Sequence, residues 1–142
     1  MTAIREQICA ILDARLAAIP GVAEYERDPS GDPSDFPAIS MTDNGQRIVG
    51  GESGITCYAL DLTIEVYAEG SSGAAVSAQL NEFHAAVVSA IMQEPPINGL
   101  AESFEEGDLV RDTAHLADKP RKGFRQDFTI TFPTRRGNPA QQ

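Results

Sequence analysis

The sequence predicts an α+β fold, with two helices packed on one face of a mainly antiparallel sheet. Two segments have the apolar spacing of amphipathic helices, and several others alternate apolar and polar residues as strands do. The predicted strands are grouped, without the strict strand–helix alternation of a parallel sheet. At 142 residues the chain is long enough to bury one core. We expect a single domain over residues 1–136 and a flexible C-terminal tail over 137–142.

The first helix is predicted over residues 3–19, where apolar residues recur at intervals of three and four and form one buried stripe. Its members are Ile4, Ile8, Ile11, Leu12, Leu16 and Ile19. Pro20 and Gly21 end this helix. The following VAEYERDP has the weaker pattern of a short strand, with Val22 and Tyr25 as its apolar residues.

A turn-forming segment, DPSGDPSDFP at 28–37, comes next. Its aspartates suggest calcium, but prolines occupy ligand positions of an EF-hand loop and no glutamate closes it, so we expect no metal ion. FPAISMTD at 36–43 is typical of a strand, and DNGQ at 43–46 of a hairpin turn. Residues 44–56, with the glycine-rich IVGGESG, are predicted to be a mobile loop.

The clearest strand is YALDLTIEVYAEG at 58–70. Leu60, Leu62, Ile64 and Val66 form its predicted buried face, and the polar residues between them face the other way. The second helix is predicted over 74–92, after a cap supplied by Ser71, Ser72 and Gly73 and before Pro95 and Pro96. Its apolar stripe is Val76, Leu80, Phe83, Val87, Val88 and Ile91.

Two more strands are predicted, over 108–116 and in the segment GFRQDFTITF at 123–132, with the turn ADKPRKG at 117–123 between them. The last strand places Phe124, Phe128, Ile130 and Phe132 on one side and polar residues on the other. We expect the core to form where this strand meets the clearest strand and the second helix. Its predicted centre is Leu62, Ile64, Val66, Phe83, Val87, Phe128 and Ile130.

Motifs that carry chemistry are missing from the sequence. It has no nucleophile elbow, zinc-protease motif, phosphate-binding loop or dinucleotide fingerprint. The carboxylates of Glu105, Glu106 and Asp108 are predicted to lie in a solvated turn, and His84 stands without a second ligand at metal-binding spacing. Cys9 and Cys57 are far apart and are expected to be reduced thiols. We therefore predict no enzyme activity, no cofactor and no metal.

Charge is unevenly distributed along the chain. There are 21 acidic and 11 basic residues, a net charge of -10, yet six bases fall within residues 119–136. They are Lys119, Arg121, Lys122, Arg125, Arg135 and Arg136. An acidic body argues against wrapping nucleic acid, but it suits the wall of a channel or an ordinary solvated surface. Charged residues interrupt every apolar stretch, so we expect no membrane-spanning helix.

Four segments together resemble a known family. IREQICAILDARLAAIPGV looks like its opening helix, and FPAISMTDNGQRI resembles its strand leading into a long hairpin loop. YALDLTIEVYAEGSSGAAVSAQLNEFHAAVVSAI looks like its main strand running into the second helix. GFRQDFTITFPTRRGNP resembles its closing strand. The family is that of the tail terminator (minor tail protein U-like) proteins of long-tailed bacteriophages, and the similarity covers nearly the whole chain.

This resemblance implies a structural role without catalytic residues. Members of the family form a homohexameric ring that caps the head-proximal end of the tail tube, ends its polymerisation and offers a docking surface to the neck. The implied partners are other copies of the chain, the tail tube protein and a head–neck completion protein. DNA would only pass through the lumen. The implied location is the virion tail at the head–tail junction, after assembly in the host cytoplasm.

The predicted contacts with neighbouring subunits or partners are bases near the end of the chain and residues of the glycine-rich tip of the predicted loop. They are Arg121, Lys122, Arg135, Arg136, Gly50, Gly51 and Glu52. A basic end on an acidic body supplies the opposite charges that a head-to-tail ring contact needs, although a merely solubilising terminus gives the same pattern. Three other functions stay open. The first is a different neck or tail-completion protein, and the second is a small cytosolic enzyme or ligand-binding domain, which would have a large apolar pocket. The third is a bacterial protein of another role that only shares the α+β layout.

Overall fold

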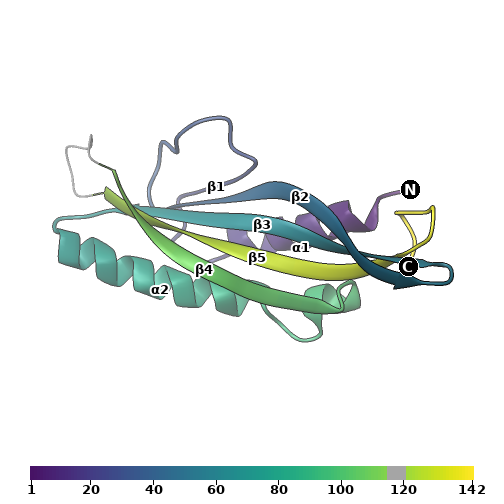
Figure 1. Cartoon of the computed structure of the whole chain (residues 1–142). Coiled ribbons are helices and arrows are strands. Elements are labelled where there is room, and N and C mark those ends of the chain that lie inside the picture. Colours follow the sequence, from purple (N-terminus) through teal and green to yellow (C-terminus); the bar gives the residue numbers. More distant parts are fainter. Residues whose placement is uncertain (115–120) are drawn as a thin grey trace.

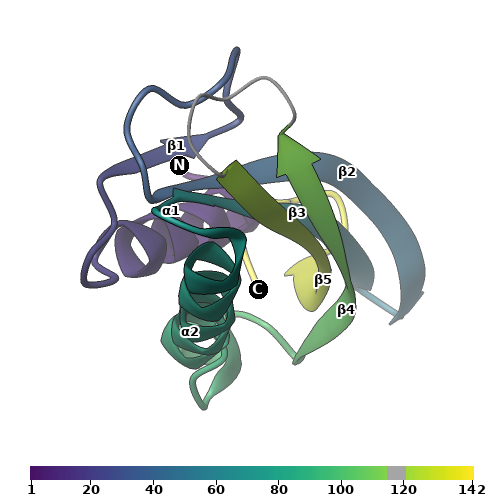
Figure 2. The same ribbon diagram turned by 90° about the vertical axis from the view of Figure 1, so that its left-hand side faces the viewer.

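Two helices cover one face of a five-stranded sheet in the computed structural model (Figures 1 and 2). The structure describes residues 1–114 and 121–142. This arrangement confirms the predicted α+β fold with both helices on a single face. The elements are α1 (Ile4–Ala17), β1 (Glu24–Arg27), β2 (Ala38–Glu52), β3 (Ile55–Glu69), α2 (Gly73–Ile91), a short 3-10 helix η1 (Pro96–Gly99), β4 (Ser103–Ala114) and β5 (Arg121–Arg135).

The strands lie in the order β1-β2-β3-β5-β4, and every neighbouring pair is antiparallel except β1 with β2. β5 pairs with β3 along its whole length, from Ile55 opposite Arg135 to Glu69 opposite Arg121. The last strand of the chain is therefore an inner strand of the sheet, and β4 forms one edge. β1 is short and pairs with only the first four residues of β2, so the rest of β2 forms most of the other edge.

The core lies between the sheet and the two helices. All seven residues predicted at its centre are buried, with Phe83 the most exposed at 8%. The alternation predicted for β3 and β5 is confirmed, because the apolar residues predicted on the inner faces of both strands are buried while Arg125 and Asp127 are exposed. Aromatic rings extend the core toward β4, where Phe104 packs edge-on against Phe128 with 5.8 Å between the ring centroids.

The helix ends agree with their sequence signals. Ser72 caps α2 as predicted, because its hydroxyl accepts a hydrogen bond of 3.1 Å from the Ala75 amide. At the other end of α2, Arg15 from the last turn of α1 donates to the Ile91 carbonyl at 3.1 Å. A cation at this position satisfies a helix carbonyl that has no partner inside the helix. It also holds the two helices together.

The predicted hairpin turn at 43–46 is wrong, and residues 44–52 form a strand rather than the predicted loop, while the mobility predicted for this segment stays a prediction. β2 continues to Glu52, and the chain turns only at Ser53 and Gly54. The Asn-Gly pair forms a bulge, with the register shifting between Asp43 and Gln46. The physical reason is a local hydrogen bond, since the Asp43 carboxylate accepts from the Gly45 amide at 2.8 Å and Gly45 has a φ of 103°. The result is a long two-stranded hairpin.

The predicted loop around Glu105 and Glu106 is also a strand, because β4 begins at Ser103 rather than at 108. A second bulge lies between Glu106 and Leu109. Gln126, buried on the helix side of β5, donates to the Gly107 carbonyl at 3.2 Å and so stabilises the bulged backbone. Residues 115 and 116 of the predicted strand, residues 117–120 of the predicted turn and the base Lys119 lie outside the described residues. Residues 121–123 belong to β5.

Residues 137–142, expected to be a flexible tail, turn back toward the sheet (Figure 1). The Ile4 amide donates to the Pro139 carbonyl at 2.9 Å, and the Arg135 amide donates to the Gln141 carbonyl at 2.8 Å. These bonds join the end of the chain to the start of α1 and to the end of β5.

Candidate assembly surface

The structure brings two of the predicted contact groups together at one end of the sheet. Arg135 lies opposite Ile55, which in turn lies opposite Glu52. The Arg136 amide donates to the Gly54 carbonyl at 2.9 Å. The β2–β3 hairpin, which carries Gly50 and Gly51, therefore lies beside the C-terminal turn (Figure 1). Sequence reasoning identified both groups but gave no sign that they are neighbours.

Exposed apolar side chains accompany these charges. Ile48 is 73% exposed, Val49 49% and Ile55 38%. The backbones of Arg135 and Arg136 are held by hydrogen bonds while both side chains are exposed, and neither has an acidic partner within the described part of the chain. We call these side chains the hairpin patch; it consists of Ile48, Val49, Ile55, Arg135 and Arg136, which lie on both faces of the hairpin end of the sheet. Apolar groups next to unpaired cations are typical of a protein–protein contact.

Arg121 and Lys122 lie at the opposite end of β5, roughly 45 Å away if the strand has an ordinary rise per residue. Arg121 is already engaged, because its Nε lies 2.8 Å from the Glu69 carboxylate and its guanidinium lies 4.3 Å from the centre of the Phe36 ring. The Lys122 side chain lies beside Gly73, at the start of α2. The four basic residues predicted as contacts thus do not form one cluster.

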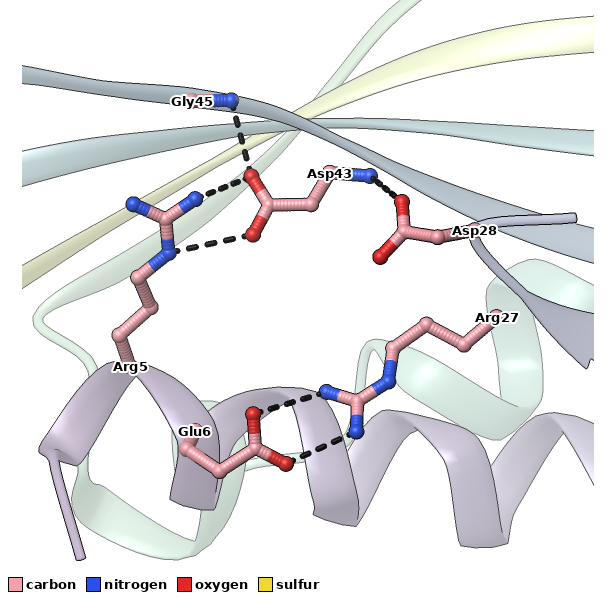
Figure 3. A network of polar contacts seen from close by, with 6 residues as sticks. All are labelled: Arg5, Glu6, Arg27, Asp28, Asp43 and Gly45. Carbon is pink, nitrogen blue, oxygen red and sulfur yellow. Dashed lines mark hydrogen bonds and ion pairs between the residues drawn. The ribbon is translucent and has the colours of Figure 1, made fainter. Parts of the chain in front are cut away.

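A network of ion pairs anchors the base of the hairpin (Figure 3). Arg5 of α1 binds the Asp43 carboxylate with two nitrogens, and the Asp43 amide donates to Asp28 at 2.9 Å. Beside it, Arg27 of β1 makes two hydrogen bonds to Glu6, of 2.8 and 3.0 Å. These contacts fix the bulge where β2 extends beyond β1. Sequence reasoning missed this network, since no local pattern marks a pair 38 residues apart.

The network makes the stability of the fold depend on pH in the acidic range. Burial alone would raise the pKa of Asp43, but hydrogen bonds from Arg5 and the Gly45 amide hold it below its ordinary 3.8. The Arg27 hydrogen bond lowers the pKa of Glu6, and the Arg47 hydrogen bond lowers that of Asp61. A carboxylate whose pKa is lower in the folded protein than in the unfolded chain stabilises the fold at pH values above its unfolded-state pKa. This stabilisation is lost as the pH falls through the folded-state pKa.

We therefore expect the free energy of unfolding to fall as the pH drops from about 5 to about 3. Asp43→Asn should make this decrease shallower, because one of the titrating groups is gone. Urea denaturation followed by circular dichroism at several pH values measures both slopes. Equal slopes for the two proteins would contradict the role of Asp43. The matched control is Asp32→Asn, at a carboxylate that forms no ion pair among the described residues.

A second exposed surface follows β4. Residues 105–111 are all exposed, and the strand has no neighbour on its outer side among the described residues. Leu109 is 36% exposed and Val110 44%. We call these side chains the edge patch; it consists of Glu105, Glu106, Asp108, Leu109 and Val110, which lie on both faces of the edge strand β4. An uncovered edge strand with apolar side chains is prone to contact another chain.

The face of the sheet opposite the helices is polar. Asn44 donates to the Thr63 hydroxyl at 2.7 Å, and Thr63 donates to Asp127 at 2.7 Å, so a row of hydrogen bonds crosses three strands. A shallow cleft of about 450 Å³ lies here, bordered by Thr63, Arg125 and Asp127 among others. It differs from the enclosed, mostly apolar cavity of a small-molecule site. His84 lies elsewhere, edge-on to Phe124 and 4.0 Å from Glu106.

No helix in residues 1–114 and 121–142 combines the length and apolar character needed to cross a membrane. In the same residues no three side chains of histidine, cysteine, aspartate or glutamate come together as a metal site would require. The distinctive surface features of the described residues are the hairpin patch, with its two arginines, and the edge patch, with its three carboxylates.

Comparisons with known proteins give similarity at the level of fold. No family model matches the chain, and no curated protein matches it. Among solved structures, it is similar to a chain of the "Virion of native gene transfer agent (GTA) particle". The TM-score is 0.53 at 19% sequence identity, and the match covers 92% of this chain and 92% of that chain. The chain thus shares its fold, over 92% of its length, with a protein of that particle.

Proposed function

We propose that this chain is a structural protein of a phage-like virion and that it ends the tail tube as a ring. The observation that carries the proposal is the fold similarity to a chain of a gene transfer agent virion, which extends over 92% of both chains. The four sequence segments that resemble the tail terminator family supply the more specific role. In this role the chain is not an enzyme.

The surfaces of the molecule are consistent with such a role. A ring needs two different surfaces on each copy, and the hairpin patch and the edge patch differ in position and charge. The net charge of -10 lets the remaining acidic surface line a lumen through which DNA passes without binding. The tail tube protein and a head–neck completion protein would contact the two faces of the ring.

Deleting the gene from the genome that encodes this protein should give particles with tails of uncontrolled, excessive length. Without a terminator nothing stops tube polymerisation, so a count of tail lengths by electron microscopy measures the effect directly. Supplying the wild-type chain should restore a single tail length. Native mass spectrometry of the purified protein, alone and with tail tubes, should show hexamers in at least one of the two conditions.

Two other outcomes distinguish the alternatives. Tails of normal length that lack heads would reassign the chain to a head–tail joining role. Normal, infectious particles would remove it from assembly altogether and favour a protein that shares only the fold.

A further inference from the structure

We propose that the ring contact is made by the hairpin patch of one copy against the edge patch of the next. This inference rests on the proposed ring and specifies the partner of each surface. Its first support is that the two patches contain every large exposed apolar residue of the described chain apart from Met1. An apolar surface that stays exposed in one subunit is expected to be covered in the assembly.

The second support is charge complementarity. The hairpin patch presents the guanidinium groups of Arg135 and Arg136, which have no acidic partner among the described residues. The edge patch presents the carboxylates of Glu105, Glu106 and Asp108 around Leu109 and Val110. Exposed charges of the opposite sign accompany both patches, because Glu52 lies opposite Ile55 on the hairpin, and Arg111 and Arg125 lie beside Val110. The cations still outnumber the carboxylate at the hairpin, and the carboxylates still outnumber the cations along β4, so the excess charges are opposite in sign. This excess disfavours a symmetric dimer through two copies of the same patch.

The third support is position. The hairpin patch lies at one end of the sheet, where β2 and β3 turn, while the edge patch runs along the side formed by β4. A contact between two different surfaces is heterologous, so each added copy presents a new open surface until a ring closes. The neighbouring cation Arg47 is already bound to Asp61 at 2.8 Å, which leaves the two C-terminal arginines as the cations of the patch.

A charge exchange tests this contact. The hairpin variant is Arg135→Glu with Arg136→Glu, and the edge variant is Glu105→Lys with Asp108→Lys. All four side chains are exposed, so circular dichroism should show that both variants fold. The fraction of protein in hexamers should fall roughly tenfold or more for each variant alone, because the two patches that meet in the ring now carry like charges and repel each other. Glu26→Lys with Glu82→Lys, an equal change of charge at exposed positions elsewhere, should leave the hexamer intact.

Combining the two variants, which restores opposite charges across the contact, tests the pairing more directly than either variant alone. A one-to-one mixture of the hairpin and edge variants should form hexamers of three copies of each, because like variants repel and unlike variants attract. The chain carrying all four substitutions should form hexamers by itself. Native mass spectrometry distinguishes these compositions by mass. Where rings form only on tubes, the same variants, expressed singly and together in the gene-deleted particle, are scored by restored tail length.

Failure of this inference is separable from failure of the proposed function. Hexamers or normal tails with either variant alone would show that the ring uses other surfaces, while the terminator role stands. Loss with each variant but no recovery in the mixture or in the fourfold variant would also reject the pairing of these two patches. If the wild-type chain forms no hexamers and its deletion leaves tails normal, the ring itself is wrong.

Discussion

Phe128→Ala is expected to lower the free energy of unfolding by about 3–5 kcal/mol, the cost of leaving a cavity where a large aromatic ring was buried. Phe128 is only 1% exposed and lies on the inner strand β5, opposite Leu62 of β3. Its ring also packs edge-on against Phe104, and that contact is lost with it. Urea denaturation followed by circular dichroism measures the change.

Glu82→Ala is the matched control for this substitution. Glu82 lies on α2, outside both patches, and is exposed, so the control should change stability by less than about 0.5 kcal/mol. A loss at Phe128 no larger than that of the control would show that β5 does not close the core in the way described.

Gly123→Ala is expected to cost about 1–3 kcal/mol through overpacking. A Cβ atom at this position would lie 2.4 Å from Cδ1 of Tyr67 and 2.9 Å from the Val66 carbonyl oxygen. The tyrosine ring has little freedom to move, because its hydroxyl donates to Glu65 at 3.0 Å. Burial, with the nearby Glu65 carboxylate, raises the pKa of Tyr67 to about 12, so the hydroxyl remains a donor at neutral pH.

The double variant Gly123→Ala with Tyr67→Ala isolates the cause. Removing the ring makes room for the added methyl group, so the two changes together should cost less than the sum of the single changes. Gly31→Ala is the control, since a Cβ there meets no atom within 4 Å and stability should be nearly unchanged. If the losses of unfolding free energy in the two single variants add exactly in the double variant, the destabilisation by Gly123→Ala comes from the backbone contact rather than from the contact with Tyr67.

The regular parts of this fold could be predicted from the sequence because buried residues recur at regular intervals along helices and strands. Leu60 to Val66 of β3 and the aromatic residues of β5 alternate as their burial alternates. Five of the six residues predicted for the apolar stripe of α2 are buried, and Val88 is half-buried. No such periodicity marks the bulge at Asp43. Asn-Gly favours a tight turn locally, and the outcome was decided by contacts with Arg5 and Asp28, which are distant in sequence.

The candidate site was predicted only in pieces. Gly50, Gly51 and the two C-terminal arginines were identified by composition and charge, but the strand register that makes them neighbours is a property of the whole sheet. Leu109 and Val110 resemble ordinary core residues of a strand. Only the position of β4 at the sheet edge shows that they are exposed.

The place of β5 in the sheet bears on how the chain folds. Thr63 and Asp127 are hydrogen-bonded neighbours although 64 residues separate them, whereas β2 and β3 are joined by a tight turn. Local hairpins form in microseconds, while pairing between distant segments is slow because a long loop must first close. The pairing of β5 with β3 is therefore expected to limit the folding rate. Until then its aromatic residues stay unpaired with the rest of the core, and the chain is at its most prone to aggregate.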